Sequence, residues 1–183
     1  QSSLAAGILS VGGQAILLDN SIMPMTRYGV VYHRASGGIH VHTSNESPCR
    51  TYIEFFDENG INISRSKERN VENLMNQHDY DRCKAEDIKG VIRVENFHEI
   101  FVRQGLEQIV HLDEIRRRNL KIVLASYSEN CASIAYKFLE NLGCNVNLIW
   151  SGIDNLMDST LYKNISGYVT RRKADLGVII KGN

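Results

Sequence analysis

The second half of the chain alternates apolar strand-like runs with helical segments, and this alternation constrains the fold more than any other feature. The predicted segments are strand 120–125, helix 130–142, strand 146–150, helix 156–172 and strand Leu176–Ile180. Ile134, Phe138 and Leu142 give the first of these helices an apolar face, and Gly143 follows as its C-terminal cap. Strands alternating with helices form a parallel sheet with right-handed crossovers, so this half predicts an α/β fold.

The first half predicts a similar mixture with shorter strands. The segments are helix 4–11, strand Ala15–Leu18, helix 24–34, strand 39–42, strand Thr51–Phe56 and a short helix around 71–75. Pro24 suits the first turn of a helix, and the run Asp57-Glu58-Asn59-Gly60 suits a turn. The run Ala15–Leu18 is apolar at every position, which is typical of a strand buried on both faces. The predicted fold class is α/β throughout, with mixed to parallel sheets.

Two domains are predicted, with their joint near Val94. The segment 78–89 is polar enough to be a surface connection, and a longer helical stripe runs from Phe97 towards Arg116. A chain of 183 residues can hold two small domains, each with its own core. We therefore expect two three-layer α/β/α domains, 1–94 and 95–183.

Charge and hydropathy exclude several classes of protein. The 21 Lys and Arg residues balance the 21 Asp and Glu residues, so the chain lacks the basic surface of a general nucleic-acid binder. The one dense basic run, 116–118, is typical of a solvated helix end. Apolar stretches fall short of the roughly 20 residues that span a bilayer. The sequence predicts no nucleic-acid partner, no membrane partner and a cytoplasmic protein.

The four cysteines predict neither a zinc site nor a disulfide scaffold. Cys49, Cys83, Cys131 and Cys144 are widely spaced and form no paired CxxC motif. We expect thiols that are buried or incidental in a reducing compartment.

Chemistry in an open α/β sheet is expected in the loops that follow the carboxyl ends of the strands. The loop after strand 120–125 lacks the GxGxxG pattern, so a Rossmann nucleotide site is not supported. The segment Gly-Ile-His-Val-His-Thr-Ser-Asn-Glu-Ser-Pro, 38–48, places hydroxyl, amide and carboxylate groups in a tight loop. Ser44 could accept a phosphoryl group with Glu46 or His42 as its base. The alternative is a turn in which these side chains satisfy only their own backbone.

Segment 38–48, followed by Tyr-Ile-Glu-Phe-Phe-Asp-Glu-Asn-Gly, 52–60, resembles the active-site serine segment of the α-D-phosphohexomutase superfamily, the phosphomannomutases and phosphoglucomutases. That segment usually reads T-A-S-H-N-P, then G-I-K-F-F and an acidic turn with Gly. Segment 139–144 continues the resemblance, and Ala-Asp-Leu-Gly-Val, 174–178, resembles the start of the family's metal loop. The subfamily it most resembles is the mutase-like portion fused to sugar-1-phosphate nucleotidyltransferases such as mannose-1-phosphate guanylyltransferase.

The resemblance implies a carbohydrate-metabolism enzyme of four domains, of which this sequence would hold the second and most of the first. The initial strand, the sugar-reading third domain and the phosphate-binding fourth domain would be missing. In the family a phosphoserine donates its phosphoryl group to a hexose phosphate, and the bisphosphate intermediate returns the other one. Mg²⁺, held by three aspartates and the serine phosphate, neutralises the developing charge. The implied partners are a hexose phosphate, the missing domains and, in the fused subfamily, a nucleotidyltransferase.

The sequence departs from the family pattern at the serine loop. Ser44 lies four residues before Pro48 where the family has three, so either Ser44 or Asn45 occupies the nucleophile position. Glu46 stands where the family has His, and Glu54 stands where it has Lys. Two added carboxylates would repel a phosphorylated substrate.

A second departure affects the metal loop. Lys181 and Asn183, on either side of Gly182, stand where the family has its first two aspartates. A charged lysine cannot ligate Mg²⁺ and a neutral amide ligates it weakly, so we expect the chain not to bind the ion. We also expect Ser44 and Glu46 to face the end of Leu176–Ile180.

Two functions follow. The first is a fragment of a phosphohexomutase, an intramolecular phosphotransferase that is inactive in this truncated form. The second is a catalytically degenerate mutase-like module, with a structural or sugar-phosphate-sensing role beside a fused nucleotidyltransferase. A third interpretation, an unrelated nucleotide-binding α/β protein, is disfavoured because the chain has no phosphate-binding loop.

Overall fold

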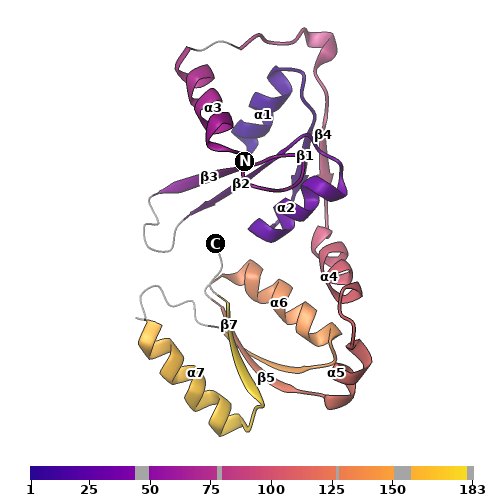
Figure 1. Cartoon of the computed structure of the whole chain (residues 1–183), viewed down its shortest axis with the longest axis vertical. Helices are drawn as coiled ribbons and strands as arrows, with labels where there is room; N and C mark the ends of the chain where they lie inside the picture. The colour runs from indigo at the N-terminus through magenta and orange to yellow at the C-terminus, as the bar shows by residue number, and fades with distance from the viewer. Residues whose placement is uncertain (44–49, 78–79, 127, 151–157, 181–183) are drawn as a thin grey trace. The chain divides into compact units, whose positions relative to one another are not determined.

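The computed structural model describes residues 1–43, 50–77, 80–126, 128–150 and 158–180. The chain is an α/β protein that divides into two compact units, with the boundary between Phe97 and His98. We call the described residues up to Phe97 unit 1 and those from His98 unit 2; Figure 1 shows the elements of both. The predicted α/β fold with parallel sheets is confirmed. The assignment of 1–94 and 95–183 to particular mutase domains stays a prediction.

Among its described residues, unit 1 contains three α-helices, one 3₁₀ turn and four strands. They are α1 (Ser2–Ser10), β1 (Ala15–Leu18), α2 (Met23–Tyr32), β2 (Gly38–Thr43), β3 (Thr51–Phe56), α3 (Arg65–Gln77), a 3₁₀ turn (Ala85–Asp87) and β4 (Val91–Val94). The strands form two separate pairs: β1 pairs with β4 in parallel, and β2 pairs with β3 in antiparallel orientation. The two predicted strands 39–42 and Thr51–Phe56 are therefore observed, and they pair with each other.

Helix α2 packs against strands from both pairs, which holds unit 1 together. Pro24 occupies the first turn, where its missing N–H leaves no intrahelical bond unmade. A Cβ on Gly29 would stand 2.6 Å from Leu18 of β1, and one on Gly38 of β2 would stand 2.4 Å from Val30. The absence of side chains at Gly29 and Gly38 therefore permits the close approach of α2 to both strands.

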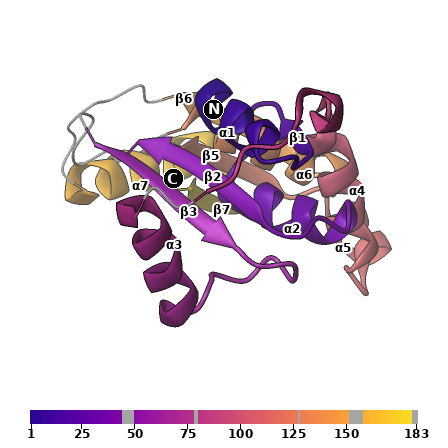
Figure 2. The ribbon, with the colours of Figure 1, turned by 90° about the horizontal axis from the view of Figure 1, so that it is seen from above.

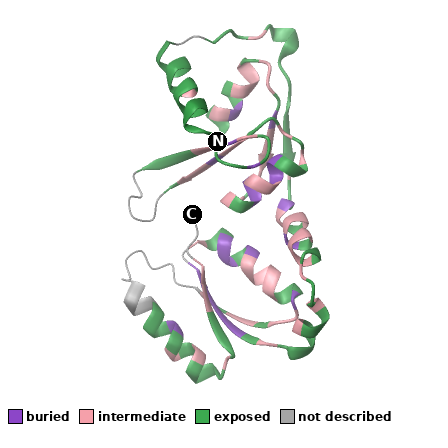
Figure 3. Cartoon of the chain, viewed as in Figure 1, coloured by how far each residue is buried: buried purple, intermediate pink, exposed green. Residues whose placement is uncertain are grey.

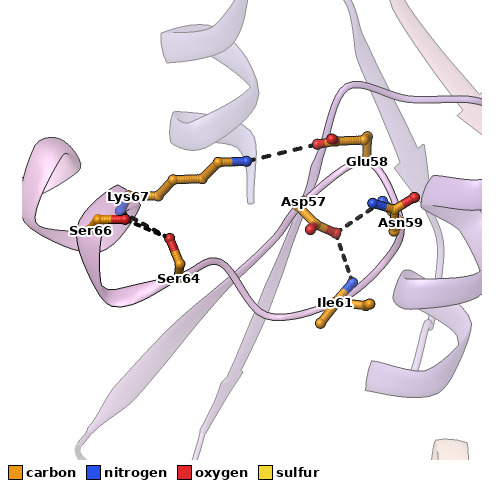
Figure 4. A network of polar contacts seen from close by, with 7 residues as sticks. All are labelled: Asp57, Glu58, Asn59, Ile61, Ser64, Ser66 and Lys67. Atoms are coloured by element: carbon orange, nitrogen blue, oxygen red, sulfur yellow. Dashed lines mark hydrogen bonds and ion pairs between the residues drawn. The ribbon is translucent and has the colours of Figure 1, made fainter.

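The turn after β3 follows its sequence signature. One carboxylate oxygen of Asp57 accepts hydrogen bonds from the backbone N–H groups of Asn59 at 2.9 Å and Ile61 at 3.0 Å (Figure 4). The bond from Ile61 is the main reason that the pKa of Asp57 lies below its ordinary value. Gly60 has a φ of +71°, a left-handed conformation that glycine adopts without strain. A residue with a side chain would be strained there.

Unit 2 is built around a three-stranded parallel sheet. Its elements, the first of which begins at the last residue of unit 1, are α4 (Phe97–Glu107), α5 (Leu112–Arg118), β5 (Lys121–Ser126), α6 (Glu129–Asn141), β6 (Asn145–Trp150), α7 (Asp158–Arg172) and β7 (Leu176–Ile180). The strand order is β6-β5-β7 with all pairs parallel, so α6 and α7 are the crossover helices that connect these strands. Val123, Leu124 and Ala125 of the central strand are fully buried (Figure 3).

Two elements differ from the sequence-based prediction. The helical stripe from Phe97 to Arg116 is two helices, because after Glu107 the chain turns through 108–111 before α5 begins. Strand β4 was not predicted; its residues Val91 and Ile92 are exposed, so the segment lacks a buried strand's signature. Among the helices that the structure describes, none is both long and apolar enough to cross a bilayer.

Candidate functional site

The predicted site residues lie in segments that the structure does not describe. Ser44, Asn45 and Glu46 fall in the gap between β2 and β3, and Lys181, Gly182 and Asn183 follow β7. The strands that lead into these segments are described up to Thr43, from Thr51 and up to Ile180. The candidate site is therefore built from the side chains at the base of the serine loop, and the predicted approach of Ser44 and Glu46 to the end of β7 stays a prediction.

Four ionisable or aromatic side chains share one face of the β2–β3 pair. In this register His40 lies opposite Glu54 and His42 lies opposite Tyr52. Alternate residues of a strand point to the same face, so all four side chains gather there. Nε2 of His42 lies 3.1 Å from a carboxylate oxygen of Glu54, with 13% of the histidine side chain and 28% of the glutamate side chain exposed. We call His40, His42, Tyr52 and Glu54 the His–Glu cluster.

The contact with Glu54 fixes how His42 can act. A carboxylate accepts a hydrogen bond, so Nε2 of His42 carries the proton in both the neutral and the charged ring. Its other nitrogen, Nδ1, is buried and has no hydrogen-bond partner. The His42 ring stacks between His40 and Tyr52, with ring centroids 5.6 Å and 5.4 Å apart. The arrangement leaves Nδ1 as an unused proton acceptor two residues before Ser44.

His40 has a structural role in the same cluster. Its Nδ1 lies 2.9 Å from the hydroxyl of Thr26 on α2, which ties β2 to that helix. Burial lowers the pKa of His40, the neighbouring His42 lowers it further, and Glu54 opposes the shift. Burial therefore favours the neutral form of His40.

In the described part of unit 2, the serine hydroxyls at the carboxyl end of β5 form hydrogen bonds with the backbone of their own loop. The Ser126 hydroxyl donates to the carbonyl of Ser128 at 3.0 Å and accepts from its N–H at 3.2 Å. Ser128 is also the N-cap of α6. Both hydroxyls serve local backbone, which is the structural alternative that the sequence left open for such loops.

The residues present do not fit Mg²⁺. The segment expected to hold the ion offers a lysine ammonium, a glycine and one neutral amide in Lys181, Gly182 and Asn183, whereas Mg²⁺ is bound in proteins mainly through carboxylates. Elsewhere, the described residues contain no group of three or more His, Cys, Asp and Glu side chains that could hold a metal.

Sequence reasoning singled out two of the four members of this site, His42 and Glu54, without their pairing. His42 was a candidate base and Glu54 a departure from the family pattern, but their mutual contact and the bond between His40 and Thr26 were missed. The alternation His40-Val41-His42 beside a second strand was the available signal, since it places both rings on one face. The register that sets Glu54 beside His42 depends on the loop, whose length alone does not determine it.

Comparison with known proteins identifies relatives for both units. Residues 1–82 match the family described as "Phosphoglucomutase/phosphomannomutase, alpha/beta/alpha domain I". A phosphoglucomutase/phosphomannomutase of Thermococcus kodakarensis is 25% identical over 80% of this chain and 32% of its own length. A phosphoglucosamine mutase of Prochlorococcus marinus is 25% identical over 99% of this chain and 40% of its own. The chain thus spans about two fifths of such relatives or less.

A solved structure agrees with this relationship. A crystal structure from Thermus thermophilus, assigned as a phosphomannomutase, matches with a TM-score of 0.65 over 93% of this chain and 40% of that chain. Its sequence identity is 14%, so the likeness concerns the fold. Residues 1–82 are therefore similar to the first α/β/α domain of phosphoglucomutases and phosphomannomutases, and the chain has the α/β fold of phosphohexomutase domains.

Proposed function

We propose that this chain is the serine-loop portion of a phosphohexomutase-type protein, that its ligand is a hexose phosphate, and that Ser44 carries the phosphoryl group. The match of 1–82 to the first mutase domain supports the proposal most strongly, because that range contains the serine loop. The names of the relatives include mutases for glucose, mannose and glucosamine phosphates, so the substrate class is kept as hexose phosphates.

The His–Glu cluster removes one objection to this function. Glu54 would repel a phosphorylated sugar as a free carboxylate, but its contact with His42 at 3.1 Å allows the pair to be neutral overall when His42 is protonated. A protonated His42 also provides a second N–H, at Nδ1, that can donate to a phosphate oxygen. The imidazolium of His42 would thus be a cationic hydrogen-bond donor beside Glu54, the position where the family has lysine.

The proposed transfer is a single exchange of bonds. The bond between Ser44 Oγ and phosphorus breaks while a sugar hydroxyl oxygen forms a bond to the same phosphorus. The hydroxyl proton passes to a base, for which Glu46 and the neutral His42 Nδ1 are the candidates. Ser44 Oγ leaves with the bonding electron pair and takes up a proton. The reverse transfer from the other end of the sugar restores phosphoserine.

The experiment is phosphorylation of the chain by a hexose 1,6-bisphosphate, followed by mass spectrometry of the peptide that contains residues 44–46. We expect a phosphoryl group on Ser44, its loss in Ser44→Ala and its retention in Asn45→Ala. Phosphorylation that survives in Ser44→Ala would contradict the assignment of the nucleophile. His42→Asn is the matched variant for the base, and we expect it to slow labelling without removing the acceptor.

A second candidate function is a degenerate mutase-like module that binds a sugar phosphate without transferring it. The sequence of the metal loop favours it, because Lys181 and Asn183 replace carboxylates. Calorimetric titration with mannose, glucose and glucosamine 6-phosphates separates the two. Binding without labelling of Ser44 supports the module, and labelling supports the mutase. If the chain shows no binding and no labelling, both functions are excluded. Its fusion to a nucleotidyltransferase stays a prediction.

A further inference from the structure

The turn between β3 and α3 contains the pair Asn59-Gly60, which the proposed function does not use. Both neighbouring elements are labelled in Figure 2. Asn59 is exposed, whereas Gly60 is buried. An asparagine followed by glycine is chemically labile, because glycine has no side chain to keep its backbone nitrogen away from the asparagine amide. This pair is the one Asn-Gly in the sequence.

Backbone and side-chain hydrogen bonds hold the pair in a closed turn. The N–H of Gly60 donates to the carbonyl of Asp57 at 3.0 Å, and the N–H of Asp57 donates to the carbonyl of Ile61 at 2.8 Å. Figure 4 shows the carboxylate of Asp57 as the acceptor for the N–H groups of Asn59 and Ile61. The pKa of Asp57 is lowered mainly by the bond from Ile61, and a hydrogen bond from the Asn59 side chain contributes to the same shift. The nitrogen of Gly60 and the side chain of Asn59 are thus both hydrogen-bonded in the closed turn.

Helix α2 holds the same turn through Arg27. Its guanidinium donates to the carbonyl of Gly60 at 3.1 Å and to the side-chain oxygen of Asn62. The guanidinium carbon lies 4.4 Å from the centre of the Phe56 ring, at the end of β3. These contacts keep Gly60 in place, so its nitrogen can approach the side chain of Asn59 only when the turn opens.

We propose that Asn59 is a site of spontaneous deamidation and that the closed turn suppresses the reaction until it opens. The backbone nitrogen of Gly60 forms a bond to Cγ of Asn59, and the side-chain nitrogen of Asn59 leaves as ammonia with the proton of the Gly60 N–H. Water then adds to one of the two carbonyl carbons of the resulting cyclic imide. The bond from that carbon to the Gly60 nitrogen breaks, and the nitrogen takes up a proton. The product is isoaspartate or aspartate, depending on which bond breaks.

Either product weakens the turn. Isoaspartate adds one carbon to the backbone between positions 59 and 60, which moves Gly60 away from the carbonyl of Asp57 and from Arg27. Aspartate adds a negative charge beside Asp57 and Glu58. Hydrolysis of the imide does not restore asparagine, so the change is irreversible. The site therefore records how often the turn has opened during the life of the molecule.

The test incubates the whole chain at neutral pH in water enriched in oxygen-18, both folded and in urea. Opening of the imide incorporates one heavy oxygen, and tandem mass spectrometry locates it in the peptide that contains residues 57–62. In the folded chain we expect deamidation of Asn59 to be about tenfold or more slower than in urea, because several hydrogen bonds must break together. Asn62 is the internal control, since the branched side chain of Ile63 hinders the same attack, and it should react far more slowly than Asn59 in urea.

Three variants test the contacts that close the turn. Asp57→Ala removes the acceptor carboxylate and Arg27→Met removes the donor from α2, so each should speed the reaction in the folded chain by about threefold to tenfold. Asp57→Asn keeps an acceptor oxygen and should retain most of the protection. In urea all three variants should react at the wild-type rate. Circular dichroism before incubation confirms that each variant is folded.

Equal rates at Asn59 in the folded chain and in urea would overturn the role of the turn. A rate in urea no greater at Asn59 than at Asn62 would overturn the site itself. Full protection in both Asp57→Ala and Arg27→Met would show that these contacts do not hold the reaction back. If Asp57→Ala does not fold, the comparison rests on Arg27→Met, and wild-type protection in that variant overturns the proposal.

Discussion

At the scale of single residues, the histidines of β2 show how position on one strand separates two roles. His40 and His42 lie two residues apart on the same face, and their rings stack. His40 bonds to Thr26 and burial lowers its pKa, whereas His42 contacts a carboxylate and has a buried Nδ1 without a hydrogen-bond partner. The His42 ring, which is nearer to the serine loop, is therefore the better candidate for chemistry.

The shifted pKa of His40 predicts an acid sensitivity of the fold. The pKa of His40 is lowered in the folded chain from an ordinary value of 6.5, so the unfolded chain takes up a proton first as the pH falls. This contribution to stability is complete above about pH 6.5 and decreases as the pH falls from there towards the folded pKa. We expect the thermal midpoint to fall between about pH 7.5 and 5.5, and to fall less in His40→Asn.

The control for this prediction is His111→Asn. His111 is 72% exposed, so its removal should leave the pH profile unchanged. A profile of equal steepness in His40→Asn and the wild-type chain would show that burial of His40 does not contribute.

Gly60 gives a second residue-scale prediction. Its φ of +71° is costly for any side chain, and an added Cβ would stand 2.6 Å from the carbonyl oxygen of Arg27. We expect Gly60→Ala to lower the free energy of unfolding by about 1–2 kcal/mol or more. Gly7→Ala in α1 is the matched control, because its Cβ would meet nothing within 4 Å. Alanine there should stabilise α1 by about 0.5–1 kcal/mol, as measured by circular dichroism during denaturation.

At the scale of elements, the pattern of apolar residues determined what could be predicted. Long helices with one apolar face, such as α6, and strands flanked by turn residues, such as β3, lie within a residue or two of the predicted bounds. Strand β4 was missed because Val91–Val94 is short, follows Gly90 and owes its conformation to pairing with the distant β1. The predicted single helix failed at 108–111, where local propensity gives no clear stop.

The central strand of unit 2 carries a prediction at this scale. Leu124 is fully buried between β6 and β7, so Leu124→Ala should cost about 2–5 kcal/mol through lost burial and the cavity left behind. Val110, which is 87% exposed, supplies the control, and Val110→Ala should change stability by less than about 0.5 kcal/mol. The chain's single tryptophan, Trp150, belongs to β6, so its fluorescence in urea reports on this unit. Similar urea midpoints for the two variants would contradict the prediction.

At the scale of the whole molecule, the fold class was predictable and the completed site was not. Alternating strands and helices fix the parallel sheet of unit 2, and the serine segment points to the mutase relatives that the comparisons identify. The relation of Ser44 to Lys181 depends on two segments outside the described residues, so local patterns do not determine it. The His42–Glu54 contact depends on strand register, which the sequence of the loop leaves open.

The last prediction concerns Mg²⁺ and the chain as a whole. Calorimetric titration should show no saturable heat, because the segment that corresponds to the metal loop offers an ammonium group and one neutral amide where the ion needs carboxylates. The variant with both Lys181→Asp and Asn183→Asp supplies two carboxylates, and any heat that Mg²⁺ produces should be confined to it. A coupled assay with mannose 1-phosphate or glucose 1-phosphate and the matching bisphosphate should likewise show no turnover. Saturable Mg²⁺ binding by the wild-type chain, or turnover that Ser44→Ala abolishes, would contradict this prediction and would exclude the degenerate module.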